Sequence, residues 1–74
     1  MNLLERIVID PHVAHGRPVV RGTRIRGADV LALLAAGASE DEILEDYPYL
    51  VVDDIRACLA YAATQAEHTI LLAS

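Results

Sequence analysis

The segment from His15 to Ile25 concentrates the side chains of this protein that are best suited to chemistry. It reads His-Gly-Arg-Pro-Val-Val-Arg-Gly-Thr-Arg-Ile, and Arg26 follows directly. Because the chain contains no lysine, every basic side chain that is always charged is a planar guanidinium, which binds carboxylates and phosphates through paired hydrogen bonds. The segment therefore predicts a site for an anionic partner, with the candidate residues Arg17, Arg21, Gly22, Thr23, Arg24 and Arg26.

The charges of the chain are divided between its two parts. Residues 1–27 carry five arginines and two acids, whereas residues 28–74 carry one arginine and nine acids. The net charge of −5 argues against binding of nucleic acid by the whole surface, although a local patch can still reach phosphates. The arginines therefore have three interpretations: they contact a protein partner, they contact DNA, or they pair with acids of this chain or of a second copy.

The other reactive residue types do not form a catalytic or metal-binding pattern. His12, His15 and His68 lack ligand-like spacing with Cys58 or with the acids. Ser39 is better explained as a helix cap, and Cys58 as a buried, inert thiol on the apolar face of a helix. The sequence thus predicts a non-enzymatic protein with no cofactor and no metal.

Size and composition predict a single, self-associating domain. Seventy-four residues lie near the lower limit for an independent core, yet 54% of them are apolar. So short a chain cannot bury that much apolar surface alone, so we expect a homodimer or a bound protein partner. A single cysteine, no leader-like start and no long apolar run predict a cytoplasmic protein with no membrane segment.

The first 27 residues read as a small β element. Residues 6–10 form a β-branched run that ends at Pro11 and predicts a strand. Residues 18–20 and 23–25 predict two more short strands on either side of Arg21-Gly22, where Gly22 can supply the positive φ of a tight turn. In such a strand Arg24 and Arg26 would share one face.

Residues 28–68 read as a three-helix unit, followed by a tail at 69–74. The predicted helices cover residues 30–36, capped by Asp29 and ended by Gly37; residues 40–46, opened by a Ser39 capping box; and residues 53–67, with Asp53 as the substitute cap. The apolar tail is expected to extend the third helix. The expected core is Ile7, Ile9, Val19, Ile25, Val30, Leu34, Ile43, Leu44, Ile55, Leu59 and Ala62, with Tyr47, Tyr49 and Tyr61 at its rim.

Several motifs in this order resemble a family, the small bacterial domain of unknown function numbered four hundred and thirty-three. They are Arg-Ile-Val-Ile-Asp-Pro at 6–11, Gly-Arg-Pro-Val-Val-Arg-Gly-Thr-Arg-Ile at 16–25, Leu-Ala-Ala-Gly-Ala-Ser at 34–39, Glu-Ile-Leu-Glu-Asp-Tyr-Pro at 42–48 and Asp-Ile-Arg-Ala-Cys-Leu-Ala-Tyr-Ala at 54–62. Two departures are Arg26-Gly27 in place of the usual Pro and aliphatic residue, and Val51 in place of a capping Thr or Ser.

The resemblance implies a fold and a function that residue patterns alone do not give. It implies a mainly helical α+β domain, with a short N-terminal β-hairpin or sheet followed by a three-helix, helix-turn-helix-like bundle of the homeodomain-like or winged-helix-like kind. Members resemble VapB-type antitoxins of toxin–antitoxin pairs, which accompany a nuclease toxin with a PIN-like fold.

Together the residues and the resemblance favour an antitoxin-like protein that binds and neutralises a PIN-like nuclease through its arginine segment. One alternative is a dimeric, DNA-binding transcriptional regulator that uses the same arginines. Base reading by the third helix is disfavoured, because Asp53, Asp54 and Glu67 would repel phosphates. A homodimeric accessory protein is the third alternative.

Overall fold

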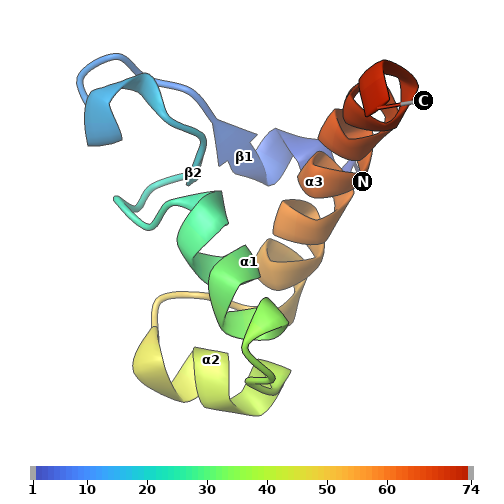
Figure 1. The fold of residues 1–74 in the computed structure, drawn as a ribbon. Coiled ribbons are helices and arrows are strands. Elements are labelled where there is room, and N and C mark those ends of the chain that lie inside the picture. Colours follow the sequence, from blue (N-terminus) through green and yellow to red (C-terminus); the bar gives the residue numbers. More distant parts are fainter. Residues whose placement is uncertain (1, 74) are drawn as a thin grey trace.

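The computed structural model describes residues 2–73, and the side chains of residues 2–66, as a short N-terminal sheet on three helices (Figure 1). The mainly helical α+β fold predicted from the sequence is confirmed. Its elements, in chain order, are the 3-10 turn η1 (Leu3–Arg6), β1 (Ile7–Val8), the turn η2 (Ala14–Gly16), β2 (Val19–Val20), α1 (Gly27–Ala35), α2 (Glu40–Asp46) and α3 (Val52–Ala73).

The sheet consists of two strands. β1 and β2 pair antiparallel, with Ile7 opposite Val20 and Val8 opposite Val19. The third strand predicted at 23–25 is wrong: only an isolated bridge joins Val19 to Arg26. The chain still doubles back here, because Val20 N–H donates to the Ile25 carbonyl at 2.9 Å. Because residues 21–24 form the tight turn between Val20 and Ile25, too few residues remain to form the hydrogen-bonded pairs of a third strand.

The loop between the strands contains a left-handed turn. Ala14, His15 and Gly16 have φ values of 51°, 56° and 79°, a conformation that non-glycine residues adopt at a cost. The loop is closed by Asp10, whose Oδ1 accepts from His12 N–H at 2.8 Å and whose carbonyl accepts from Val13 N–H at 2.9 Å. These bonds hold the chain so that Pro18 leads directly into β2.

α1 begins at Gly27, three residues before the predicted start, and Asp29 is not its cap. Arg26 occupies the N-cap position without a side-chain capping bond, and Asp29, inside the first turn, forms an ion pair with Arg26 instead. The helix ends at Ala35, one residue before the predicted Ala36, and the predicted stop at Gly37 is confirmed. Gly37 has φ +98°, and the N–H groups of Gly37 and Ala38 donate to Leu34 and Leu33, the bonding pattern of a Schellman motif.

α2 has the predicted bounds and the predicted cap. The Ser39 hydroxyl accepts from Glu42 N–H at 3.1 Å, and the Glu42 carboxylate accepts from Ser39 N–H at 2.9 Å. These two bonds lower the pKa of Glu42 below its usual value, because they favour the ionised carboxylate. Local sequence alone thus determines where this helix starts.

α3 is capped by a different aspartate from the one predicted. Asp54, not Asp53, accepts a hydrogen bond from Val51 N–H at 3.0 Å, which is the reciprocal half of a capping box. Asp54 is only 7% exposed and also accepts from Arg6 Nη1 at 3.0 Å. The helix continues to Ala73, so the predicted extension of the third helix into the tail is confirmed as far as that residue.

The core lies where the three helices meet the inner side of β2. Its buried members are Val20, Val30, Ile43, Leu50, Ile55 and Cys58. Two expected core residues are wrong: Ile9 is 61% and Leu59 46% exposed. Ile9 follows β1 rather than lying in it. On α3, residues 54, 55, 57 and 58 are buried instead, so the helix is rotated relative to the stripe predicted through Leu59.

The Cys58 thiol is fully buried in this core, as predicted. Burial, together with the nearby Asp54 carboxylate, raises its pKa to about 11, because both disfavour a thiolate. Within the described residues, no helix is long and apolar enough to cross a membrane.

Removing the Asp54 carboxylate should destabilise the fold. The Asp54→Ala variant leaves the Arg6 guanidinium without its closest carboxylate and Val51 N–H without its acceptor, so we expect a loss of about 3 kcal/mol in the free energy of unfolding. The Asp53→Ala variant is the control: Asp53 lies 3.7 Å from Arg6 and is more exposed, so its loss should be under about 1 kcal/mol. Urea denaturation measures both values, and equal losses would contradict the assignment.

Replacing Gly37 with alanine should reduce the stability of the fold more than replacing Gly27. The Gly37→Ala variant places a Cβ on a backbone with φ +98° and should lower stability by about 1–2 kcal/mol. Gly27 lies in α1, where an added Cβ would meet Cys58 Sγ at an ordinary 3.8 Å, so Gly27→Ala should be neutral or slightly stabilising. Thermal unfolding of the two variants compares them directly.

Cys58 should resist alkylation in the folded protein at pH 8. The folded thiol has a raised pKa of about 11 against an ordinary 9.0, so the folded state keeps its proton where the unfolded state loses it. The contribution of the Cys58 thiol to the free energy of unfolding is fully present below pH 9 and is lost as the pH rises from 9 to 11. Iodoacetamide labelling with and without urea tests this, and fast native labelling would contradict the burial.

Candidate partner-binding site

The centre of the predicted arginine site is a rigid turn, residues 20–25, hereafter the arginine turn. Thr23 N–H donates to the Val20 carbonyl at 3.0 Å, and Gly22 has φ +78° at the third position, as a type II turn requires. The half-buried Thr23 hydroxyl donates to the same carbonyl at 2.8 Å and accepts from Ile25 N–H at 3.0 Å. Gly22 and Thr23 therefore shape the turn rather than present side chains to a partner.

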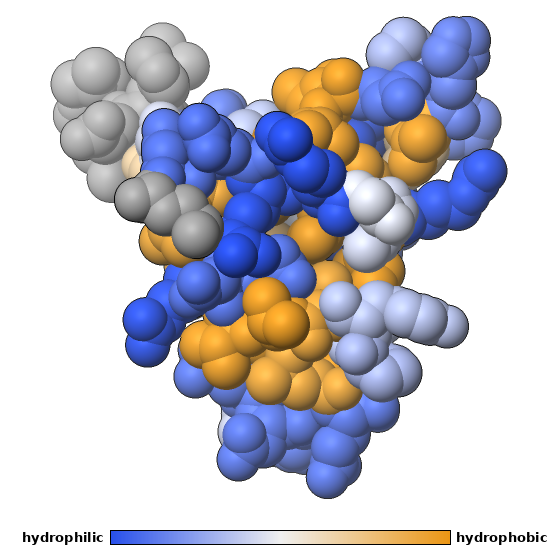
Figure 2. Space-filling view, turned by 180° about the vertical axis from the view of Figure 1, so that it is seen from behind, coloured by the Kyte–Doolittle hydropathy of each residue, from blue (hydrophilic) through white to orange (hydrophobic). Residues whose placement is uncertain are grey.

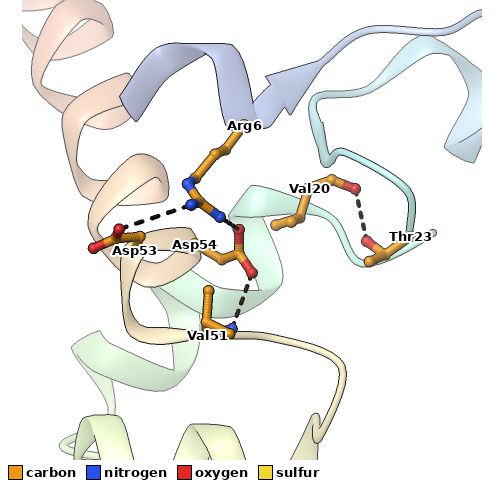
Figure 3. A network of polar contacts seen from close by, with 6 residues as sticks. All are labelled: Arg6, Val20, Thr23, Val51, Asp53 and Asp54. Carbon is orange, nitrogen blue, oxygen red and sulfur yellow. Dashed lines mark hydrogen bonds and ion pairs between the residues drawn. The ribbon is translucent and has the colours of Figure 1, made fainter. Parts of the chain in front are cut away.

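Arg6 links the arginine turn to α3, and Figure 3 shows its side chain beside Asp53 and Asp54 at the start of that helix. The Arg6 carbonyl accepts a hydrogen bond from Arg21 N–H at 2.7 Å. The Arg6 side chain binds Asp54 at 3.0 Å and lies 3.7 Å from Asp53. The sequence placed Arg6 in the positive charge of residues 1–27, in the strand predicted at 6–10 and in the motif at 6–11, but did not indicate its pairing with α3. Its role depends on a contact across 48 residues, for which no local signal exists.

Arg21 and Arg24 are the exposed charges of the arginine turn. In the part of the chain whose side chains are described, neither forms a salt bridge. Arg24 lines a shallow pocket of about 470 Å³ with the turn and with Tyr47 and Tyr49. The geometry therefore joins the Arg24 side chain to an aromatic surface that comes from the segment between α2 and α3.

Arg17 and Arg26 lie at a different place. Both line a groove between α1 and the middle of α3, together with Tyr61, Ala62 and other residues. Arg26 is also held by Asp29, with Nε–Oδ2 and Nη2–Oδ1 distances of 3.2 and 3.1 Å. The prediction that Arg24 and Arg26 share a strand face is wrong, because the segment is a turn and the two side chains line separate hollows.

Tyr49 is the residue of this site that sequence reasoning assigns wrongly. The sequence predicts it at the rim of the core, and it is instead 82% exposed. Leu50, its neighbour, is 5% exposed and holds the segment to the core. Tyr49 follows Pro48 in the turn between two helices, and this proline-containing turn is the feature of the sequence that could have indicated an exposed side chain.

The start of α3 is poorly suited to reading DNA. Its first turn carries two acids, Asp53 and Asp54, and Asp53 remains 46% exposed at its side chain despite the neighbouring Arg6. A helix that enters the major groove needs donors for phosphates and base edges at this end. The geometry therefore does not favour α3 as a recognition helix.

The residues described hold no catalytic constellation. Among the side chains described, those of residues 2–66, no three His, Cys, Asp or Glu residues are grouped to hold a metal ion. The Ser39 hydroxyl is engaged in the cap of α2, and Cys58 is buried with a raised pKa. What the arrangement offers is recognition: two exposed arginines, of which Arg24 lies beside the exposed Tyr49.

Apolar side chains also reach the surface of this small domain. Figure 2 shows them in orange on the rear face, above the hydrophilic lower end that α2 forms. Large apolar residues that are at least 37% exposed are Leu4, Ile9, Tyr49, Val51, Val52 and Leu59. The described core thus accounts for only part of the high apolar content.

The chain is similar to segments of two longer curated proteins. It is 43% identical over 58 residues to "Uncharacterized protein y4eO" of Sinorhizobium fredii, covering 78% of this chain and 26% of that protein. It is 44% identical over 41 residues to "Putative antitoxin VapB45" of Mycobacterium tuberculosis, covering 55% of this chain and 17% of that protein. The chain therefore spans about a quarter or less of the curated relatives it matches.

A solved structure shares the fold. A crystal structure of a DUF433 member from Anabaena variabilis superposes with a TM-score of 0.79 at 33% sequence identity, covering 85% of this chain and 62% of that one. The sequence family described as "Protein of unknown function (DUF433)" matches residues 7–62. That span includes β1, the arginine turn and most of the side chains described on α3, and this chain belongs to the DUF433 family.

Proposed function

We propose that this chain is a non-enzymatic, antitoxin-like protein that binds and neutralises a nuclease toxin with a PIN-like fold. The observation that carries the proposal is the exposed pair Arg21 and Arg24 on a rigid turn, without a salt bridge among the side chains described. The similarity to the M. tuberculosis protein named "Putative antitoxin VapB45" supports the same class of function.

The chemistry of the arginine turn suits a partner with clustered carboxylates. A metal-dependent nuclease holds its ion with acidic side chains, and a guanidinium can bind a carboxylate through two parallel hydrogen bonds. The turn is preorganised by Thr23 and by Arg6, so less conformational entropy is lost when the arginines bind. Arginine and tyrosine are also the residue types that most often dominate the energy of protein interfaces, and Tyr49 lies beside Arg24.

The six candidate residues do not contribute equally to this proposal. Arg21 and Arg24 make the charged contacts, and Tyr49 adds an aromatic one. Gly22 and Thr23 act by fixing the turn. Arg26 is already bound by Asp29, and Arg17 lines the groove on α1 and α3, so both lie outside the main contact.

Identifying the partner is the first experiment. The tagged chain is used to capture proteins from its native cells, and mass spectrometry identifies those recovered in stoichiometric amount. The proposal requires a small nuclease whose activity on RNA falls when the purified chain is added. A stoichiometric partner without nuclease activity, or an unaltered nuclease rate, would contradict it.

Replacing both exposed arginines should weaken the complex with that nuclease. The Arg21→Ala/Arg24→Ala variant loses two charge-assisted contacts, so we expect its dissociation constant to rise at least about tenfold. Neither side chain makes a salt bridge within residues 2–66, so the melting temperature should stay within a few degrees. Isothermal titration calorimetry and thermal unfolding measure the two quantities.

The Arg56→Ala variant is the matched control. Arg56 is an exposed arginine on α3, outside the arginine turn, and its loss should leave the affinity unchanged. Equal weakening by both variants would indicate a general charge effect instead of a site. Binding of the wild-type chain to duplex DNA at low salt, lost in the double variant and steeply dependent on salt, would favour the regulator over the antitoxin.

A further inference from the structure

The groove between α1 and the middle of α3 combines apolar walls with a few polar side chains. α1 packs against α3 (Figure 1), and the groove encloses about 590 Å³. Its polar side chains come from Arg17, Arg26 and Gln65, and its apolar walls include Pro18, Leu31 and Ala62. Small-molecule sites are commonly hollows of about 300–1,000 Å³ that are mostly apolar, and in helical proteins they lie between helices. The groove therefore has the size and the composition of a ligand site.

The groove is short along both helices. It is lined by α1 residues from Gly27 to Leu31 and by α3 residues from Tyr61 to Ala66. These segments are about 6 Å and about 7.5 Å long at roughly 1.5 Å per residue. A helix that docks in a groove inserts side chains as far apart as positions i and i+7, which are separated by about 10.5 Å. The groove is too short for both of these side chains, so a compact molecule fits it better than a helix of a partner protein.

The charges at the groove favour a ligand with a single negative charge. The lining contains Arg17 and Arg26 and no acid. Arg26 is bound by Asp29 through two hydrogen bonds of 3.2 and 3.1 Å, so this pair is neutral. Arg17 is exposed and forms no salt bridge with the side chains of residues 2–66. One positive charge therefore remains, on a guanidinium that can bind a carboxylate through two parallel hydrogen bonds.

We infer that the groove binds a small monocarboxylic acid with a compact apolar body. Arg17 binds the carboxylate, and the apolar body lies against Leu31 and Ala62. The ring of Tyr61, which is half-buried in the lining, favours an aromatic body, because two rings gain from edge-to-face or offset contact. Neither Arg21 nor Arg24 lines this groove. The inference therefore does not depend on the proposed function, and its test uses the purified chain alone.

Titration of the isotope-labelled chain with hydrocinnamate, followed by two-dimensional NMR, tests the ligand class. We expect saturable shifts centred on the amides of groove residues such as Gly27 and Ala62. Hydrocinnamyl alcohol has the same body without the charge and should bind at least about tenfold more weakly, because the charge-assisted hydrogen bonds are lost. Absence of saturation, equal affinity for acid and alcohol, or shifts centred on the arginine turn would overturn the inference. Tighter binding of hydrocinnamyl phosphate, which carries a second charge, would overturn the assignment to a monocarboxylate.

Replacing Arg17 separates its charge from any effect on the fold. The Arg17→Gln variant should bind hydrocinnamate at least about tenfold more weakly and bind hydrocinnamyl alcohol as the wild type does. Arg21→Gln is the matched control, because Arg21 is an exposed arginine that does not line the groove, and its affinity for hydrocinnamate should be unchanged. Equal affinities of the two variants for hydrocinnamate would overturn the role of Arg17.

Filling the groove tests where the apolar body lies. The Ala62→Leu variant adds a larger side chain to the lining and should bind both hydrocinnamate and the alcohol at least about tenfold more weakly. Ala63→Leu is the control, because Ala63 is an exposed alanine of the same helix that does not line the groove. Circular dichroism verifies that both variants keep the fold. If folded Ala62→Leu binds hydrocinnamate as tightly as Ala63→Leu does, the ligand lies elsewhere and the inference is overturned.

Discussion

The contact between Arg6 and Asp54 is the interaction on which the rest of this structure depends. A carboxylate as buried as that of Asp54 needs partners, and it has two: the Arg6 guanidinium and the Val51 N–H group. The first joins η1 and β1 to α3, and the second sets the start of α3. Because the Arg6 carbonyl also binds Arg21 N–H, one residue connects the longest helix to the arginine turn.

Local signals determine the parts of the fold that the sequence predicts well. The Ser39–Glu42 capping box and the left-handed Gly37 act within a few residues, and the helix ends that they set are predicted correctly. The phase of α3 and the exposure of Tyr49 depend on what packs against them, which periodicity does not reveal. The Arg6–Asp54 pair also depends on tertiary packing, because its two residues lie 48 positions apart in the sequence. The motifs indicate the family, but they do not show that Arg17 and Arg26 lie in the groove between α1 and α3, away from the arginine turn.

The division of the arginines gives this small domain two separate surfaces. The arginine turn with Tyr49 is polar, charged and rigid, whereas the groove between α1 and α3 is lined mainly by small and apolar residues. A surface of the first kind suits a partner that is recognised and released, and one of the second kind suits a compact apolar ligand. The matched segment makes up about a quarter or less of each curated relative, so related segments also occur within longer chains.

The left-handed turn at Ala14–Gly16 has a stereochemical consequence. Three successive residues have a positive φ, and His15, with φ 56° and ψ 36°, adopts the mirror image of the ordinary helical backbone. In this stretch the natural handedness of the amino acids therefore opposes the fold. A D-alanine at position 14 would adopt the observed φ of 51° without the clash that an L-residue meets. In a chain short enough for chemical synthesis, inverting one stereocentre would thus strengthen the link between the two strands while leaving every side chain's composition unchanged.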